Sequence, residues 1–179
     1  DEIENDYQLN KKKLFSDKKK LKKFRDRIRL IQKINKNTLK KTLISEIKNY
    51  LKYKDTPKII GNNIKKLERY INFYPQNKVC HGDIHFGNII ISKKELYLLD
   101  WDYGLISCTG YEIAMFVHLE KLNQKQIKIL SEIFEVSIIE IRHYLPICIL
   151  LDFLYQNVLF KSINEKLIEK IEKFIGDTL

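Results

Sequence analysis

The segment between Val79 and Gly104 constrains the fold more than any other part of the chain. A polar loop with two glycines and two histidines comes first, followed by the apolar run 89–91, a polar stretch, the apolar run 96–99 and a second loop rich in aspartate and glycine. Two short apolar runs separated by a few polar residues predict a β-hairpin. Such a hairpin places the loop before its first strand beside the loop after its second, so we expect side chains of both loops to share one site.

Helical periodicity flanks this segment on both sides, because apolar residues recur every three or four positions. Asn62 or Asn63 is a candidate N-cap for the helix that precedes the first loop, and Pro75 is expected to end that helix. A break between two scaffold helices is expected at residues 35–38. Helices are expected over residues 21–34, 39–50, 64–74, 113–119, 127–133, 145–160 and 163–174.

These elements predict an α+β fold that is mainly helical. The length of 179 residues and the hydrophobic fraction of 44% suit one folded domain with a substantial core. We expect three parts within that domain, which are scaffold helices in 1–61, a helix with the two loops and the hairpin in 62–110, and a helical bundle in 111–179.

The chain is basic, with 33 Lys and Arg against 23 Asp and Glu. The positive charge is densest between Lys11 and Lys41, where it alternates with apolar residues at helical spacing. This pattern is typical of the solvated face of a helix, so we expect no nucleic-acid partner.

Three widely spaced cysteines, Cys80, Cys108 and Cys148, form neither a C-x-x-C pair nor an even disulfide framework, which favours a reducing, cytoplasmic compartment. The longest apolar stretch, residues 144–160, is interrupted by Pro146 and Asp152. A membrane span needs about 20 nearly uninterrupted apolar residues. We therefore expect a buried helix there and no membrane span.

The first loop fits the pattern H-x-D-x-x-x-x-N, with His81, Asp83 and Asn88 at its fixed positions. In phosphoryl-transfer enzymes this pattern sets an aspartate against the attacking hydroxyl and uses the asparagine to hold magnesium. A second oxygen ligand is available at Asp100, which ends the second apolar run as the D-F-G aspartate of kinases does. A turn rich in Asp and Gly is the structural alternative for either motif alone, but both motifs in this order favour a metal site.

The form H-G-D-x-H-x-G-N with a following L-D-W-x-Y resembles the aminoglycoside phosphotransferase and choline kinase superfamily. The resemblance implies the C-terminal lobe of a protein-kinase-like fold and a kinase that uses ATP and Mg²⁺. It further implies that Asp83 orients or deprotonates the acceptor hydroxyl, that Asn88 and Asp100 bind Mg²⁺, and that His81 is a structural member of the loop. His85 is expected either to contact the transferred phosphate or to orient the loop.

Trp101, Asp102 and Tyr103 resemble the aromatic, acidic and tyrosine residues that follow the metal-binding aspartate in choline and thiamine kinases. Aromatic rings can hold a quaternary ammonium group by cation–π attraction. Core packing is favoured for Trp101, and Asp102 is a candidate substrate contact. Family members commonly carry proline at Phe86 and aspartate at Glu112, which leaves the packing of these loops open.

The resemblance also implies an N-terminal ATP-binding lobe, yet no glycine precedes Gly61 and the residues before His81 are helical in pattern. The sequence starts at Asp1, and Met115 is its single methionine. We therefore expect a piece of a longer kinase that lacks this partner lobe and is inactive alone.

Two other functions stay open. Asp83-Ile84-His85 matches the D-x-H start of dinuclear metallophosphoesterases, although only His118 and His143 follow as further histidines. A catalytically inactive kinase-like binding module is the other alternative. For a kinase, the acceptor is a small-molecule alcohol such as choline, ethanolamine, thiamine or an aminoglycoside.

Overall fold

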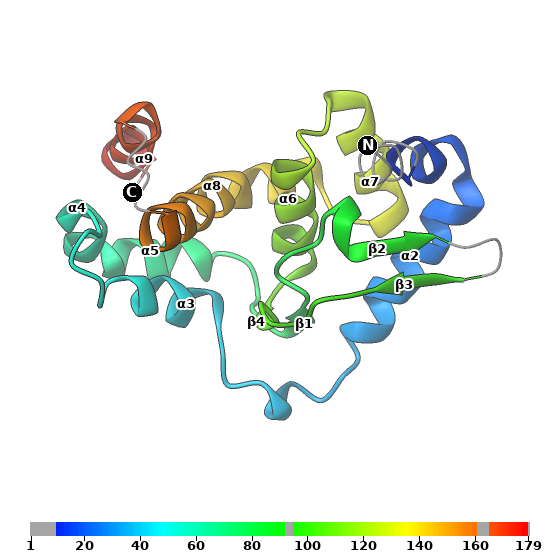
Figure 1. The fold of residues 1–179 in the computed structure, drawn as a ribbon, viewed down its shortest axis with the longest axis horizontal. Coiled ribbons are helices and arrows are strands. Elements are labelled where there is room, and N and C mark those ends of the chain that lie inside the picture. Colours follow the sequence, from blue (N-terminus) through cyan, green and yellow to red (C-terminus); the bar gives the residue numbers. More distant parts are fainter. Residues whose placement is uncertain (1–9, 92–94, 161–164, 179) are drawn as a thin grey trace.

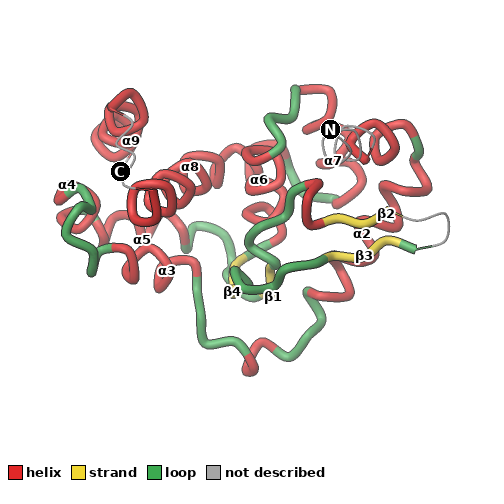
Figure 2. Tube along the Cα trace, viewed as in Figure 1, coloured by secondary structure: helices red, strands yellow, loops and turns green. Residues whose placement is uncertain are grey.

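The computed structural model describes residues 10–91, 95–160 and 165–178, and most of them are helical (Figures 1 and 2). The α+β, mainly helical fold predicted from the sequence is confirmed. The α-helices are α2 (Lys18–Ile31), α3 (Leu43–Tyr50), α4 (Lys58–Asn62), α5 (Ile64–Ile71), α6 (Thr109–Leu119), α7 (Gln124–Phe134), α8 (Ile138–Phe160) and α9 (Glu165–Thr178). The short elements are the 3₁₀ turns η1 (Lys36–Thr38) and η2 (Phe86–Asn88) and the strands β1 (Lys78–Cys80), β2 (Ile89–Ile91), β3 (Leu96–Leu98) and β4 (Leu105–Ser107).

Helix α8 links two groups of helices (Figure 1). It packs along α6 and contacts α7 on one side, and it contacts α3 and α9 on the other. Helix α2 packs against α7 and the strands β1 and β3. The long α8 therefore acts as the common support of both groups.

A chain of aromatic rings fills the core on the hairpin side. Phe24 of α2 lies 5.2 Å from Phe116 of α6 and 5.6 Å from Phe134 of α7, measured between ring centroids. Phe86 of the first loop lies 5.3 Å from Phe116. Because Phe86 is buried in this cluster, it fixes the first loop to the helical core, which settles the packing of this loop that the sequence left open.

The four strands form two separate antiparallel pairs within the described residues. The predicted hairpin is confirmed as β2–β3, with Ile89 opposite Leu98 and Ile91 opposite Leu96. The pair β1–β4 was missed, because residues 79–80 and 105–107 were assigned to loops. Each of these strands has only three residues and its partner lies on the far side of the hairpin, so no local alternation indicated either one.

The predicted helices are present, but several bounds differ. Helix α5 ends at Ile71 rather than beside Pro75, and Asn63 makes no side-chain cap at its start, since its amide nitrogen donates to the carbonyl of Ile59 in α4. Helix α8 begins at Ile138, ahead of the predicted start, and contains Pro146. Ile163 lies outside the described residues.

Helix α2 buries its four core residues against the molecule and exposes most of its lysines, as the charge pattern predicted. In the described part of the chain, no helix combines the length and apolar character needed to cross a bilayer.

Candidate active site

The first loop begins where β1 ends, at His81. This side chain is buried, and its Nε2 lies 2.7 Å from the carbonyl oxygen of Leu99, just after β3. Its Nδ1 accepts from the backbone N–H of Asp83 at 3.4 Å. Burial lowers the pKa of His81, which favours the neutral ring that this accepting role needs. The geometry supports a structural role in which His81 joins the two loops and orients Asp83.

Gly82 has a backbone conformation and a location that exclude other residues. Its φ is +81°, in the region that favours glycine, and a Cβ there would lie 2.3 Å from the carbonyl oxygen of Tyr103. The close approach of the two loops therefore depends on this glycine.

Asp83 is held by Asn88 and lies near His85. The amide nitrogen of Asn88 donates to the backbone oxygen of Asp83 at 3.0 Å and to its Oδ2 at 3.2 Å. His85 accepts from the N–H of Gly87 through Nδ1 at 3.0 Å, which leaves Nε2 3.7 Å from Asp83 Oδ2. The nearby Asp83 carboxylate raises the pKa of His85, partly opposed by burial. These contacts favour the orienting role for His85.

The hairpin brings the second loop to Asn88. The N–H of Leu99 donates to the backbone oxygen of Asn88 at 2.9 Å, so Asp100 follows directly beside it. Asp100 is exposed and has φ = 58°, in the left-handed region that aspartate tolerates better than most residues. Asn88 and Asp100 are thus brought together by β2 and β3.

These two residues fit a magnesium ion. Both hydrogen bonds of the Asn88 amide use its nitrogen, so its oxygen remains for a cation, and the Asp100 carboxylate is exposed to solvent. Magnesium prefers such oxygen ligands and usually completes its shell with water and substrate phosphates. The described residues contain no cluster of three or more His, Cys, Asp or Glu that could hold a metal ion by themselves.

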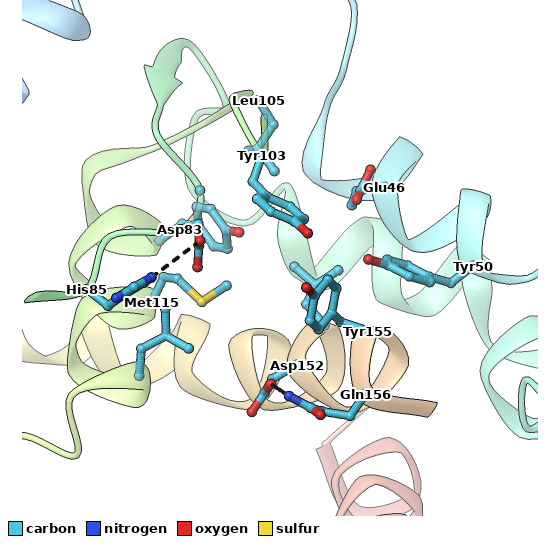
Figure 3. A pocket seen from close by; sticks show the side chains of 14 residues that line it. Glu46, Tyr50, Asp83, His85, Tyr103, Leu105, Met115, Asp152, Tyr155 and Gln156 are labelled. Atoms are coloured by element: carbon cyan, nitrogen blue, oxygen red, sulfur yellow. Dashed lines mark hydrogen bonds and ion pairs between the residues drawn. The ribbon is translucent and has the colours of Figure 1, made fainter. Parts of the chain in front are cut away.

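A cavity of about 270 Å³ opens beside Asp83. Figure 3 shows Asp83 and His85 on one side, Glu46 and Tyr50 on the other, and Tyr103 and Tyr155 between them. The other lining residues are Gly82, Leu105, Tyr111, Met115, Leu119, Leu151, Asp152 and Gln156.

The cavity combines aromatic rings with two carboxylates, each of which is paired with a basic side chain. Glu46 lies 3.2 Å from Lys41, and Asp152 lies 2.9 Å from His118, whose hydrogen bond lowers the pKa of Asp152. Burial, with a contribution from Glu46, raises the pKa of Tyr50 to about 12. At neutral pH the cavity therefore has uncharged phenols between carboxylates.

The three residues after Asp100 take different positions. Tyr103 lines the cavity, 5.7 Å from the ring of Tyr155, whereas Asp102 is exposed and does not line it. The core packing favoured for Trp101 was wrong, because this side chain is 40% exposed, with its ring 4.4 Å from that of His81 and its Nε1 donating to Leu98. A turn at the end of a three-residue strand has too little depth to bury an indole.

Sequence reasoning missed the far wall of the cavity, formed by Glu46 and Tyr50 of α3 and by Asp152 and Tyr155 of α8. A signal was present in α8, since Asp152 and Gln156 lie one turn apart in an otherwise apolar helix. Such polar pairs on a buried helix indicate a site.

Glu120 was missed as well. Its carboxylate accepts from the N–H of Phe86 at 2.6 Å and so supports the first loop from the end of α6.

The fold is shared with solved choline/ethanolamine kinase structures. The structure matches a choline/ethanolamine kinase family protein from Mesorhizobium loti with a TM-score of 0.62, at 14% identity, over 93% of this chain and 62% of that one. Choline kinase LicA from Streptococcus pneumoniae matches with a TM-score of 0.63, at 18% identity, over 87% of this chain and 63% of that one.

Sequence comparison identifies the family. The choline/ethanolamine kinase family model matches residues 5–143, and the chain therefore belongs to this family of small-molecule kinases. Choline kinase B1 of Caenorhabditis elegans is 35% identical over 72 residues, which cover 35% of this chain and 19% of that protein. The matched segments cover less than a third of the length of the curated relatives.

Proposed function

We propose that this chain is the catalytic lobe of an ATP- and Mg²⁺-dependent kinase that phosphorylates the hydroxyl of a cationic amino alcohol, such as choline or ethanolamine. The observation that carries the proposal is the cavity beside Asp83, whose far wall combines tyrosine rings with Glu46 and Asp152. Family membership supports the reaction class.

The aromatic and acidic walls suit a positively charged substrate. A cation over an aromatic ring gains roughly 0.5–2 kcal/mol, depending on how far it is desolvated. Tyr50, Tyr103 and Tyr155 supply such rings, and the carboxylates of Glu46 and Asp152 line the cavity where they can attract a cation. An amino alcohol bound there would present its hydroxyl toward Asp83.

In this proposal Asp83 accepts the hydroxyl proton and orients the oxygen for attack. Its carboxylate is fixed for that task by Asn88 and by the His81 contact to its backbone. Asn88 and Asp100 would hold Mg²⁺, which neutralises charge on the phosphates when bound. His85 orients the loop, since its Nδ1 already accepts a hydrogen bond from the N–H of Gly87.

We also propose that an ATP-binding lobe completes the enzyme over the hairpin. The chain covers only 62–63% of the matching choline kinase structures, and LicA has been crystallised with AMP. Apolar side chains around the hairpin are unusually exposed and form a surface, here called the hairpin patch, that such a lobe would cover. The hairpin patch consists of Leu30, Ile34, Ile90, Tyr97 and Trp101.

The metallophosphoesterase alternative finds no support in the described residues. His118 pairs with Asp152, and His143 stacks on Tyr70 at 3.9 Å, so neither joins Asp83 in a metal cluster. The intact set of Asp83, Asn88 and Asp100 likewise favours catalysis over an inactive binding module.

The test is Mg²⁺-dependent ATP consumption by the complete enzyme with choline, ethanolamine, thiamine and kanamycin as acceptors. Asp83→Asn, which keeps the size of the side chain, should lower kcat by at least about 10²-fold. Turnover of an amino alcohol that this variant loses would support the proposal. Phosphorylation of kanamycin but not of amino alcohols, or full activity of Asp83→Asn, would reject it.

A further inference from the structure

Lys41 stands behind the wall of the cavity that Glu46 and Tyr103 form. Its position is set by its main chain, because the carbonyl of Lys41 accepts from the N–H of Ile106 in β4 at 2.8 Å. The next residue, Thr42, forms a parallel bridge with Ile106 and caps α3. The side chain therefore starts from a fixed point beside the cavity.

The ammonium group of Lys41 uses the same groups that a cationic substrate would use. Its Nζ lies 3.2 Å from Oε2 of Glu46 and 5.6 Å from the centroid of the Tyr103 ring. The Glu46 side chain is only 13% exposed, so this ion pair is partly shielded from solvent. A carboxylate and an aromatic ring of the cavity are thus already engaged by a cation of the protein itself.

We propose that Lys41 determines the selectivity of the cavity for cationic alcohols by acting as a tethered competitor for Glu46 and Tyr103. The proposal rests on the proposed function, since it presumes that the acceptor is an amino alcohol. Lys41 weakens the field of Glu46 and adds a positive charge near the Tyr103 ring, so monocations bind less tightly than the cavity walls alone would permit. A neutral alcohol of the same shape is not affected.

The test compares Lys41→Met with Lys40→Met in the complete enzyme. Methionine keeps an unbranched stem and removes the ammonium, while Lys40 is an exposed neighbour that provides the same change of net charge. Lys41→Met removes a positive charge that lies close to Glu46 and Tyr103, where the substrate cation is proposed to bind. This change should lower the KM for choline about 5- to 20-fold. The kcat and the KM for ATP should stay unchanged, and Lys40→Met should match the parent enzyme.

A neutral probe separates charge from space. The Ki of 3,3-dimethyl-1-butanol, which has the shape of choline without its charge, should be the same in the parent enzyme and in Lys41→Met. Lys41→Gln, which keeps a polar contact to Glu46, should lower the KM for choline in the same direction and serves if the methionine variant does not fold.

Different outcomes would overturn the inference alone or the proposed function as well. An unchanged or higher KM for choline in the folded Lys41 variant would overturn the inference and leave the proposed function intact. The same would follow if the Ki of the neutral probe fell as much as the KM for choline. A parent enzyme that turns over no amino alcohol would overturn both.

Discussion

Glu112 is a buried acid beneath the loop that carries Asp83. Its side chain is 1% exposed, and neither carboxylate oxygen has a well-aligned hydrogen bond among the described residues. The Cys80 thiol and the N–H groups of Gly82 and His81 lie near enough to favour its charged form, but burial has the larger effect and raises the pKa of Glu112 to about 7. The sequence left the packing around Glu112 open, and in the structure its carboxyl group faces the first loop.

Glu112 should make stability fall with pH. The folded state keeps the proton up to about pH 7, whereas the unfolded chain loses it near 4.5, so stability declines as pH rises between these values. The full cost of ionisation is about 3 kcal/mol. Glu112→Gln should differ little from the parent enzyme near pH 4 and should exceed its free energy of unfolding at pH 8, as measured by denaturant titration. Equal stability of both proteins at pH 8 would contradict this account.

Gly82→Ala should disrupt the contact between the two loops. The added methyl group would meet the Tyr103 carbonyl, and the positive φ would be strained, so we expect a loss of about 2 kcal/mol or more and a loss of turnover. Gly176→Ala in α9 is the matched control, since nothing lies within 4 Å of its Cβ position and alanine favours helices by about 0.5–1 kcal/mol. Thermal melting and kinase assays on both variants check the prediction, which fails if Gly82→Ala retains full turnover.

Among the elements, those with a local pattern could be predicted from the sequence, and those that depend on distant partners could not. Ile89–Ile91 and Leu96–Leu98 pair across a short connection, so their alternation with polar residues indicated the hairpin and with it the meeting of Asn88 and Asp100. The pair β1–β4 lacks such a signal, and the cavity left only the polar pair Asp152 and Gln156 in α8, because their parts come from segments far apart in the chain. The loop residues Asp83, Asn88 and Asp100 were therefore easier to predict than the far wall of the cavity.

The start of α3 should control the shape of that wall. Thr42 accepts from the N–H of Ser45 at 3.2 Å, and Ser45 Oγ accepts from the N–H of Thr42 at 2.7 Å, a capping box that precedes Glu46 and Tyr50. Thr42→Ala should cost about 1 kcal/mol and raise the KM for the amino alcohol more than the KM for ATP.

Steady-state kinetics with both substrates check this prediction. Thr42→Ser keeps the hydroxyl and should behave like the parent enzyme. If both KM values of Thr42→Ala rise together, α3 has a general structural role only.

For the whole molecule, the hairpin patch is the largest group of exposed large apolar side chains in the described residues. Its members come from α2, the turn that follows α2, the hairpin and the residue after Asp100, so the patch lies next to the proposed magnesium ligands. Exposed apolar surfaces of this kind mark interfaces or association sites.

Residues 1–179 expressed alone should self-associate through the hairpin patch, and Tyr97→Lys should reduce that association. In the complete enzyme, where the proposed lobe covers the patch, Tyr97→Lys should instead destabilise the protein or raise the KM for ATP. Sedimentation velocity of the segment and kinetics of the complete enzyme check the two halves. Lys128→Ala, at an exposed position of α7, is the control. A monodisperse segment at high concentration would contradict the first half.

The division of the cavity between loops and helices has a consequence for how such enzymes diversify. Asp83, Asn88 and Asp100 lie on the loops around the hairpin, whereas the far wall comes from one face each of α3 and α8. A change of the proposed acceptor would therefore need substitutions in only a few helical turns, and the residues proposed to transfer phosphate could stay unchanged. New substrates would become accessible through small steps that each preserve the proposed catalytic groups.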